Sequence, residues 1–366
     1  MVSDTGKAIV FNGAGKPLEE KEFPIPKNID PEEVLVQISL STVCSSDVHT
    51  WLGHRPFPTP SILGHEMVGK IIAIGKNIVQ DYVGNKIQIG DRIVWSMTVS
   101  CGECYFCTTA GLPQKCLNLY KYGHVKSDVE PYFTGGYAKY VILKKGSYIF
   151  KVPSELSDEE TAPLMCAAST VTSGLDAAHF SQCDYVVIQG CGALGLYAAA
   201  FTKELGAKKI IVVDVIEERL QLAKQFGADY LINAESADVI SSVLDITEQR
   251  GADYVIEVTG SSKVIEQGIK LLRIGGKYIL LGAIYPGNNF TIDSSELITK
   301  CLEIFGRHNY APTHLETAIK LVQNSKNKYP YSKLVGPAFE FSKDGVEMAF
   351  KALENKESIR PKIIPK

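Results

Sequence analysis

Four cysteines stand close together in the stretch SCGECYFCTTAGLPQKC, which runs from Ser100 to Cys116. The first three are separated by two residues each, and the fourth follows after eight more. Four thiolates can close a tetrahedral site around Zn²⁺, and a site without an open position is structural. Redox-active or incidental thiols are the alternative, but even spacing in a glycine-containing loop is hard to explain by packing. The four cysteines are Cys101, Cys104, Cys107 and Cys116.

A second set of residues able to bind a metal is dispersed over the stretches TVCSSDVH, LGHEMVG and APLMCAAST. One histidine and two thiolates can hold a catalytic zinc and leave a fourth position open for water or substrate. Each residue alone is weak evidence, because a lone buried cysteine usually belongs to a core. The candidates in these stretches are Cys44, Ser46, Asp47, His49, His65, Glu66 and Cys166.

A glycine-rich turn in DYVVIQGCGALGLYAAA has the order G-x-G-x-x-G, follows an apolar strand and opens a helix. Such glycines allow a tight turn and a close approach to a pyrophosphate, which the amides of the helix N-terminus bind. Asp214 ends the next strand, 19 residues after Gly195. Its carboxylate can accept from a ribose 2′-hydroxyl and would repel a 2′-phosphate, which favours NAD over NADP. A helix turn with packing glycines is the alternative. The loop residues are Gly190, Gly192, Ala193, Leu194 and Gly195.

The elements that must position these residues follow two patterns. Residues up to about 155 are predicted to be rich in strands, because short apolar runs alternate with Gly, Pro and Asp. From about Leu156 strands and helices alternate, which indicates a doubly wound parallel sheet. The first helix is expected over SDEETAPLMCAASTVTSGLDAAH, with Ser157 as its N-cap. After about Phe305 we expect a return to the first domain through a helix at 314–324 and the strand PAFEFS.

The length and composition fit two domains and a small-molecule function. The chain has 366 residues, of which 45% are hydrophobic and 22% charged, and its net charge is -3. Lysines and arginines are scattered, so neither a nucleic-acid nor a membrane partner is expected. No signal peptide is recognised in MVSDTGKAIVFNG, which predicts the cytoplasm. Thiols stay reduced there, which favours metal ligands over disulfides.

The chain resembles the zinc-dependent medium-chain alcohol dehydrogenases over nearly its whole length. The pattern GHE-x2-G-x5-G-x2-I, from Gly64 to Ile78, is highly specific to that family, as is its order relative to the cysteine-rich segment and the glycine loop. The resemblance implies a GroES-like catalytic domain at 1–158 and 306–366, with a zinc-binding lobe at 100–117, and a Rossmann domain at 159–305. It places the active site in the cleft between the domains.

The resemblance also implies roles for individual residues. Glu66 lies next to the catalytic zinc and would bind it transiently. Asp47 would orient His65, as ligating imidazoles generally require. Ser46 would hold the substrate hydroxyl, and His49 would relay its proton through the cofactor ribose. The zinc ligands would be Cys44, His65 and Cys166, the four lobe cysteines would bind a structural zinc, and Thr170 would pack near the nicotinamide. Independently of the resemblance, Arg219 could partly accommodate NADP, but it is more simply a helix-surface residue near the adenosine.

Two departures from the family pattern concern the lobe and the pyrophosphate. The fourth lobe cysteine follows after eight residues, where the commonest family pattern has seven. Ser45 follows Cys44, where several relatives carry a basic residue that touches the pyrophosphate. Pyrophosphate binding is therefore expected to depend more on the glycine loop.

Basic residues suggest a substrate with an anionic head, such as sulfoacetaldehyde or phosphonoacetaldehyde. The stretch GLPQKCLNLYKYGH resembles, with less specificity, a branch of the family associated with phosphonate metabolism. Arg55 lies six residues after His49, about where ethanol dehydrogenases place a pocket aromatic, and its guanidinium could bind an anion with two donors. A surface arginine is the alternative. Weaker candidates for the same role are Lys121, His124, Arg307 and His308.

Other functions remain open at this stage. One is a general short-chain alcohol dehydrogenase or a polyol dehydrogenase, although polyol relatives often replace the third zinc ligand with an acid where this chain has Cys166. Another is a non-catalytic NAD-binding structural protein, which would typically lose the zinc ligands. The family forms dimers and tetramers, so we expect a homo-oligomer that binds NAD and two zinc ions per chain.

Overall fold

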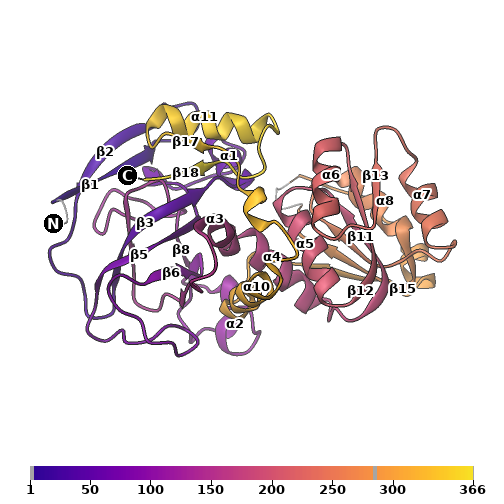
Figure 1. Ribbon diagram of the computed structural model, residues 1–366, viewed down its shortest axis with the longest axis horizontal. Coiled ribbons are helices and arrows are strands. Elements are labelled where there is room, and N and C mark those ends of the chain that lie inside the picture. Colours follow the sequence, from indigo (N-terminus) through magenta and orange to yellow (C-terminus); the bar gives the residue numbers. More distant parts are fainter. Residues whose placement is uncertain (1–3, 283–286, 366) are drawn as a thin grey trace. The chain divides into compact units, whose positions relative to one another are not determined.

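The computed structural model describes residues 4–282 and 287–365, and the chain divides into two compact units (Figure 1). The first unit comprises the chain up to Cys166 together with Ala311–Ile319 and Tyr331–Lys366. The second comprises Ala167–Tyr310 and Lys320–Pro330. The mixed α/β architecture predicted from the sequence is confirmed. Within the described ranges, no helix has the length and apolar character needed to cross a membrane.

A seven-stranded sheet forms the frame of the first unit. Its strand order is β10-β6-β5-β3-β18-β17, and β9 also pairs with β3. Separate sheets are formed by β2-β1-β4 and by β7-β8. The strands are β1 (Thr5–Phe11), β2 (Glu19–Pro24), β3 (Val34–Thr42), β4 (Ser61–Ile62), β5 (Glu66–Ile74), β6 (Arg92–Trp95), β7 (Thr98–Val99), β8 (Tyr120–Lys121), β9 (Tyr140–Leu143), β10 (Ile149–Lys151), β17 (Ala338–Phe339) and β18 (Lys362–Ile363). The helices before Cys166 are α1 (Ser45–Trp51), α2 (Tyr105–Thr108) and α3 (Asp158–Thr161), and the 3₁₀ turns there are Pro113–Lys115 and Ala162–Met165.

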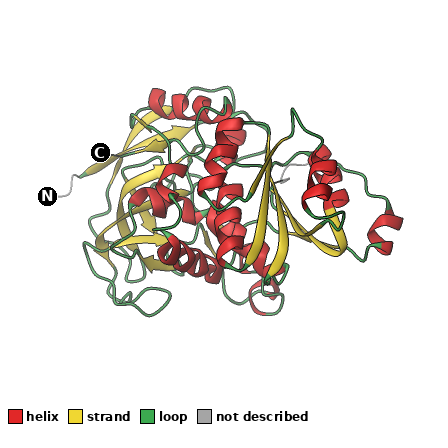
Figure 2. Ribbon diagram, turned by 45° about the vertical axis from the view of Figure 1, so that its right-hand side comes forward, coloured by secondary structure: helices red, strands yellow, loops and turns green. Residues whose placement is uncertain are grey.

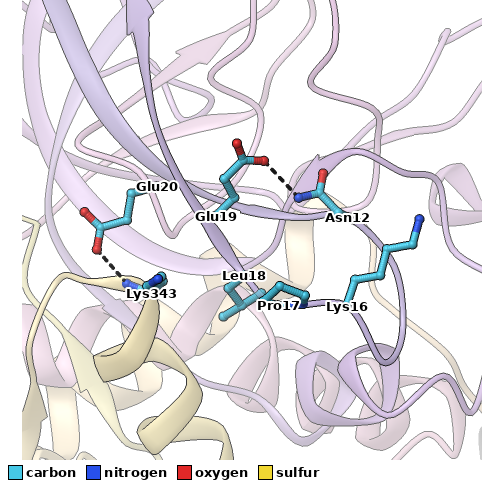
Figure 3. Close-up of a pocket in the computed structure, with 7 residues that line it drawn as sticks. All are labelled: Asn12, Lys16, Pro17, Leu18, Glu19, Glu20 and Lys343. Atoms are coloured by element: carbon cyan, nitrogen blue, oxygen red, sulfur yellow. Dashed lines mark hydrogen bonds between the residues drawn. The ribbon is translucent and has the colours of Figure 1, made fainter.

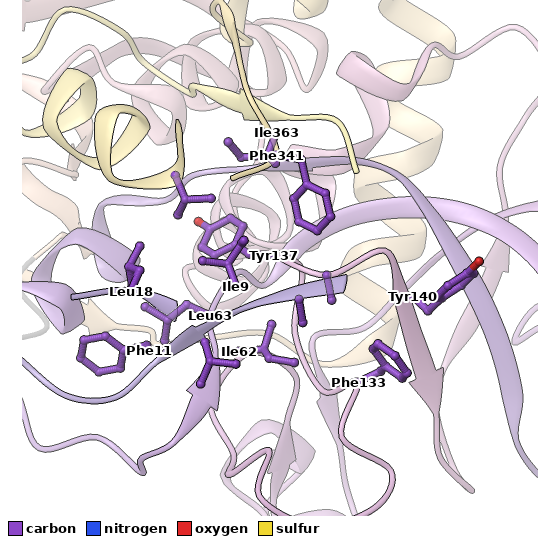
Figure 4. Packing of buried hydrophobic residues seen from close by; sticks show 14 of the residues in the cluster. Ile9, Phe11, Leu18, Ile62, Leu63, Phe133, Tyr137, Tyr140, Phe341 and Ile363 are labelled. Carbon is purple, nitrogen blue, oxygen red and sulfur yellow. The ribbon is translucent and has the colours of Figure 1, made fainter. Parts of the chain in front are cut away.

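The hydrophobic core of this unit lies beneath β1 and draws on segments far apart in the sequence (Figure 4). Phe11 and Ile62 come from paired strands, and Phe341 comes from the C-terminal segment. Four consecutive residues of β1, 8–11, belong to this core, and since successive side chains of a strand point to opposite faces, both faces of this part of β1 are buried. Tyr137 is a member of the cluster with 1% of its surface exposed, and its hydroxyl group reaches Asp47.

Six parallel strands form the sheet of the second unit, in the order β13-β12-β11-β14-β15-β16. Helices lie on both sides of this sheet (Figure 2). Because both faces are covered, the central strands are continuous apolar runs such as IIVV in β12. The strands are β11 (Cys183–Gln189), β12 (Ala207–Asp214), β13 (Tyr230–Asn233), β14 (Ala252–Glu257), β15 (Leu272–Leu280) and β16 (Glu303–Gly306). The helices are α4 (Ala167–Ala177), α5 (Ala193–Glu204), α6 (Glu217–Gln225), α7 (Val239–Ile246), α8 (Ser262–Leu271) and α9 (Ser294–Thr299).

The helix predicted to begin after Ser157 is interrupted. Ser157 is its N-cap as predicted, since its hydroxyl accepts a hydrogen bond from the Glu160 amide at 3.1 Å. The prediction of one continuous helix was wrong. Pro163 has no N–H to donate, and the chain tightens into the 3₁₀ turn before it leaves helical geometry at Cys166, where φ is -135° and ψ is -74°. The break sets Cys166 at the end of one element and the start of another.

The C-terminal segment contains more structure than predicted. The predicted helix is α10 (Pro312–Ser325), and the predicted strand contains β17. The sequence analysis did not predict α11 (Lys343–Glu354) or β18. Lys362 of β18 pairs with Thr42 of β3, so the C-terminal segment adds β18 and β17 to the large sheet of the first unit.

Candidate functional site

The four lobe cysteines lie together around α2 and the 3₁₀ turn that follows it. Their sulfur atoms are 3.4 Å apart for Cys101 and Cys116, 3.5 Å for Cys104 and Cys107, 3.9 Å for Cys104 and Cys116, and 4.0 Å for Cys101 and Cys107. Zinc–sulfur bonds of about 2.3 Å give a tetrahedron with edges of about 3.8 Å. The distances are too long for disulfide bonds, which are about 2.05 Å. The donor set therefore fits a closed zinc site, despite the eight-residue spacing before Cys116.

Backbone amides favour the thiolate form in this lobe. The Leu117 amide lowers the pKa of Cys104 to about 6. The pKa of Cys101 is also lowered, first by the Glu103 amide. The Cys116 sulfur accepts from the Asn118 amide at 3.3 Å. Such hydrogen bonds prepare Cys101 and Cys104 to bind a cation, whereas burial raises the pKa of Cys107 to about 11.

The dispersed candidates also come together, in the first unit. Cys44, His65, Glu66 and Cys166 each place a ligand atom within 4.8 Å of the others. The Cys44 and Cys166 sulfur atoms are 4.0 Å apart. Cys166 is half-buried and the other three are buried. Two sulfurs and one imidazole nitrogen fit the donor set of a catalytic zinc site, with the carboxylate beside it.

Neighbouring strand ends explain why these residues meet. Thr42, the last residue of β3, pairs with Glu66, the first residue of β5. Cys44 follows the first of these strands and His65 precedes the second, so the two ligands lie at the same edge of the sheet. Cys166 reaches that edge because the 3₁₀ turn that precedes it packs on β5 and β3.

Hydrogen bonding separates the Cys44 and Cys166 thiols into different protonation states. The hydrogen bond with Cys166 holds the pKa of Cys44 well below its usual value, and the charge of Arg360 acts in the same direction. The same hydrogen bond, together with burial, raises the pKa of Cys166. One thiolate is thus already stabilised in the protein itself.

Asp47 fixes the orientation of His65. Its Oδ1 accepts from His65 Nδ1 at 3.1 Å, which leaves Nε2 to face the cluster. Its Oδ2 accepts from the Cys44 amide and from the Tyr137 hydroxyl, both at 3.0 Å. Burial alone would lower the pKa of His65, but the charges and hydrogen bonds of Asp47 and Cys44 together outweigh it and raise this pKa to about 9. The sequence analysis missed Tyr137, because nothing in its local pattern distinguishes it from a core aromatic.

Glu66 is buried and paired with an arginine from the C-terminal segment. Its Oε2 accepts from Arg360 Nε at 3.0 Å and from the Thr42 hydroxyl at 2.6 Å. Its Oε1 is buried and has no hydrogen-bond partner among the described residues. Burial raises the pKa of Glu66 to about 7, although Arg360 opposes this. Arg360 Nη2 also lies 3.8 Å from the Cys44 sulfur, and the sequence analysis did not identify Arg360.

Ser46 and His49 lie on α1, next to the cluster. The Ser46 hydroxyl is 3.3 Å from His65 Nε2. His49 Nδ1 lies 3.0 Å from the Nδ1 of the exposed His54. Burial lowers the pKa of His49, and the charges of His54 and Arg55 lower it further. A neutral His49 is able to accept a proton.

The basic substrate candidates divide between the two units. Arg55 is half-buried in the first unit and lies over the Phe57 ring, 5.7 Å from its centre. The ring centre of His124 is 5.1 Å from that of His65. Arg307 and His308 belong to the second unit, where Arg307 donates to the Gly306 carbonyl. Among the described contacts, only those of Arg55 and His124 therefore place a basic candidate beside the metal ligands.

The glycine loop has the geometry of a phosphate-binding turn. Gly190 has a φ of +106°, and a Cβ on Gly195 would lie 1.9 Å from the Gly190 carbonyl oxygen. Gly192 is the N-cap of α5, and a Cβ there would meet no atom within 4 Å. Gly195 therefore allows the helix to pack on the turn, whereas Gly192 borders open space at the helix N-terminus. Ala193 and Leu194 are the first two residues of α5.

Asp214 ends β12 beside this loop, in the second unit. Its Oδ2 accepts from the Cys191 amide at 2.5 Å, and its Oδ1 accepts from the Val215 and Ile216 amides. The Cys191 thiol donates to the carbonyl of Arg219 on α6 at 2.9 Å, so that helix starts close to the loop. Thr170 is buried in α4 of the same unit.

A surface cavity of about 600 Å³ lies elsewhere in the first unit (Figure 3). Its hydrogen bonds join Glu19 to Asn12 and Glu20 to the Lys343 amide. It contains no cysteine or histidine, and its acids are already paired. We therefore assign it no role. The lining residues are Asn12, Lys16, Pro17, Leu18, Glu19, Glu20 and Lys343.

Comparison with known proteins matches both units to one kind of enzyme. Residues 30–154 match the family described as alcohol dehydrogenase GroES-like domain, and residues 193–324 match zinc-binding dehydrogenase. An alcohol dehydrogenase of Geobacillus stearothermophilus is 32% identical over 88% of this chain and 90% of its own length. A sorbitol dehydrogenase of Halalkalibacterium halodurans is 29% identical over 95% of both chains. The crystal structure of an alcohol dehydrogenase from Thermotoga maritima superposes with a TM-score of 0.94, at 30% identity, over 99% of this chain and 100% of that one.

Proposed function

Because this chain belongs to the zinc-dependent medium-chain alcohol dehydrogenase family, we propose that it transfers hydride between NAD(H) and a small alcohol or aldehyde. The observation that supports this most directly is the cluster of Cys44, His65 and Cys166 with Glu66 beside it. These residues would hold a catalytic zinc. A non-catalytic NAD-binding protein would have no need of three ligands and an oriented imidazole.

The protein's own residues would bind and orient the reactants. The chemistry supplied by the bound groups is Lewis-acid activation of the alcohol by zinc and acceptance of hydride by NAD. Asp47 holds the His65 ring so that Nε2 is available as a ligand. Ser46 would hold the alcohol hydroxyl and release its own hydroxyl proton as it takes up that of the alcohol, and His49 would accept the released proton and pass it to solvent.

The cofactor we propose is NAD rather than NADP. Asp214 stands at the end of β12, where its carboxylate would accept hydrogen bonds from the ribose and repel a 2′-phosphate. The open space at Gly192 supports binding of the pyrophosphate at the α5 N-terminus. Thr170 would contact the nicotinamide, and Arg219 would lie near the adenosine.

The four lobe cysteines would hold a second, structural zinc. All four positions of a tetrahedron are filled by sulfur, so no position is left for substrate. We therefore propose two zinc ions per chain. A homo-oligomer, either a dimer or a tetramer, is also part of this proposal.

The finer part of the proposal is that the preferred substrate carries an anionic head. Arg55 lies beside the candidate zinc site and donates to the Ser46 carbonyl at 3.0 Å, so its charge is placed next to the residue that would hold the substrate hydroxyl. The alternatives are a general short-chain alcohol dehydrogenase and, as the sorbitol dehydrogenase relative suggests, a polyol dehydrogenase.

The test is oxidation of NADH by the zinc-loaded protein with acetaldehyde, glyceraldehyde, sulfoacetaldehyde and phosphonoacetaldehyde in parallel. NADPH and the Cys44→Ser variant serve as controls, and zinc is counted in each preparation. We expect activity with NADH, a value of kcat/KM at least about tenfold lower with NADPH, and loss of activity in the variant. Absence of NADH oxidation by protein with two zinc ions per chain would refute the proposed reaction.

A further inference from the structure

Lys121 is a half-buried cation that nothing in the described residues neutralises. Its ammonium makes no hydrogen bond or ion pair in the described part of the chain. By contrast, Lys362, a half-buried lysine of the same unit, is paired with Glu159 at 3.0 Å. An uncompensated charge away from bulk water costs free energy, so an unpaired lysine in such a place calls for an anionic partner.

The turn that carries Lys121 is fixed against the candidate zinc site. Lys121 pairs with Thr98 across β7 and β8, and the His124 amide donates back to the Lys121 carbonyl at 3.1 Å. Between them Gly123 has a φ of +72°, and a Cβ there would lie 2.2 Å from the carbonyl oxygen of Gly64. The turn therefore packs on the backbone directly before His65.

The acids near Lys121 are already occupied. Asp47 accepts from His65, Tyr137 and a backbone amide, and Glu66 is paired with Arg360. Lys121 lies within electrostatic range of Asp47 and of the Cys44 and Cys166 thiols, but the thiols are the proposed zinc ligands. A bound zinc ion would neutralise the charge of the Cys44 and Cys166 thiolates, so the ammonium of Lys121 would still lack an anionic partner.

Arg55 adds a second cation whose donors are only partly used. Its Nε donates to the Thr50 hydroxyl at 2.9 Å, and its Nη2 donates to the Ser46 carbonyl and faces His124 Nε2 at 3.4 Å. No described residue accepts from its Nη1. The charges of Arg55 and Lys121 repel each other, and an anion placed between them would relieve this repulsion.

We propose that Lys121 is the specificity-determining residue that binds the anionic head of the substrate, with Arg55 Nη1 as the second contact. This inference rests on the proposed function and names the group in the site that selects an anion. Arg55 is held in place by Thr50 and Ser46, so it orders the site, whereas the Lys121 ammonium has all three donors available. The head is a sulfonate, phosphonate or carboxylate close to the reacting carbon, because the turn that carries Lys121 packs on the backbone directly before His65.

The experiment compares one anionic aldehyde with a neutral aldehyde of the same shape. The two aldehydes are sulfoacetaldehyde, which carries a sulfonate, and 3,3-dimethylbutanal, which carries a tert-butyl group at the same position. Both are reduced with NADH by the wild type and by Lys121→Met, Lys121→Arg and Lys126→Met. Lys126 is an exposed lysine five residues further along, which makes it the matched control. Zinc content and Tm are measured for every variant.

We expect Lys121→Met to lower kcat/KM for sulfoacetaldehyde by about 10- to 100-fold, the range of one charge-assisted hydrogen bond, and to change it less than about threefold for the neutral aldehyde. Lys121→Arg should retain part of the preference, and Lys126→Met should behave as the wild type. Equal losses on both aldehydes, or no loss on either, would overturn the inference.

Calorimetric binding of isethionate, the alcohol of sulfoacetaldehyde, separates this inference from the proposed function. It is measured with zinc-loaded protein and no NADH, beside 3,3-dimethylbutan-1-ol. Tighter binding of isethionate by the wild type than by Lys121→Met supports the anion site even if no aldehyde is reduced. Equal binding of the two alcohols by the wild type overturns it, and this result needs no folded variant.

Discussion

At the residue scale, the carboxylate of Asp47 connects three parts of the candidate zinc site. One oxygen orients His65, and the other accepts from the Cys44 amide and from Tyr137. The side chain is 1% exposed, so water cannot replace a lost partner. The orientation of His65 and the start of α1 after Cys44 therefore both depend on the Asp47 side chain.

Replacing Asp47 with asparagine should weaken zinc binding. An amide group must turn an N–H toward at least one of the donors that now face the carboxylate, and it loses the charge that favours an oriented His65. Loss of such a partner typically costs 10- to 100-fold in metal affinity or activity, so we expect about that loss. Zinc retained after dialysis against a chelator measures it, with the exposed Asp128→Asn as control. Unchanged retention in Asp47→Asn would contradict the role.

The pH dependence of anion binding should follow Lys121. Burial lowers the pKa of Lys121, and the charge of Arg55 lowers it further. The charges of the Cys44 and Cys166 thiols and of Asp47 oppose this, and the resulting pKa is about 8. The ammonium is therefore protonated below this pKa and neutral above it, so binding of isethionate should be constant at lower pH and weaken by about tenfold per pH unit well above 8. Calorimetry across this range tests the expectation. The Lys121→Arg variant should show a flat profile there, since guanidinium stays charged.

At the element scale, the two glycines at the start of α5 serve different purposes. Gly195 lets the helix pack on the strand end, because a Cβ would meet the Gly190 carbonyl at 1.9 Å. Gly192 has a φ of -81°, which any residue adopts, and has open space beside it. One glycine therefore serves the fold of the loop and the other leaves room for a ligand.

Alanine at these positions should separate stability from cofactor binding. Gly195→Ala forces the helix away from the turn, and overpacking of this kind typically costs about 1–3 kcal/mol of unfolding free energy. Gly192→Ala should leave the Tm of the free protein unchanged and weaken NADH binding by at least about tenfold, because its methyl group would occupy the pyrophosphate position. Urea unfolding and fluorescence titration with NADH measure the two effects. An equal loss of Tm in both variants would argue against this division.

Removing one lobe cysteine should remove one zinc ion without removing the activity. In Cys104→Ser the remaining three sulfurs leave the tetrahedron open, so we expect metal content to fall from two to one per chain. The Tm should fall, at roughly 2–4 °C per kcal/mol lost, and kcat at low temperature should stay within about threefold. Elemental analysis and calorimetry measure these quantities. The outcome that contradicts a structural lobe is two metal ions per chain in the variant.

Elements with a local cause were predictable, and those shaped by distant contacts were not. The N-cap at Ser157 and the turn at Gly190 follow from side chains within a few residues, and both occur as predicted. Pro163 was visible in the sequence, and as the sixth residue of the predicted helix it lay past the first turn, where proline kinks or breaks a helix; the geometry that this break gives Cys166 depended on tertiary context. The path of the C-terminal segment depends on the pairing of β18 with β3, which joins residues some 320 positions apart in the sequence.

At the scale of the whole molecule, the sequence predicted the two architectures and the donor types, but not the network that holds the donors. The cysteine spacing and the GHE pattern are local, and they identified the residues that the structure brings within 4.8 Å. Tyr137 and Arg360 were missed because each has an ordinary local context and gains its meaning from a contact 90 or 294 residues away.

Arg360 connects the C-terminal segment to the candidate zinc site, so its loss should affect the whole first unit. Arg360→Met leaves the Glu66 carboxylate buried, with only the Thr42 hydroxyl as a partner among the residues that the structure describes. Breaking a buried pair in this way costs about 3–5 kcal/mol. We expect a loss of that order in the free energy of unfolding, measured by urea titration with zinc bound. Zinc affinity should also fall, because the guanidinium supports the Cys44 thiolate.

The double variant Glu66→Gln/Arg360→Met distinguishes the lost pair from lost packing. Replacing both partners removes the unpaired charge, and exchanging a buried pair for neutral groups is often close to neutral in stability. If the pair explains the effect, the double variant should recover most of the stability lost in Arg360→Met, while Glu66→Gln alone should be destabilised because Arg360 is then the unpaired ion. If the two single losses simply add, the C-terminal segment is held by its β18 pairing and its apolar contacts, and the ion pair serves only to set the charge beside Cys44.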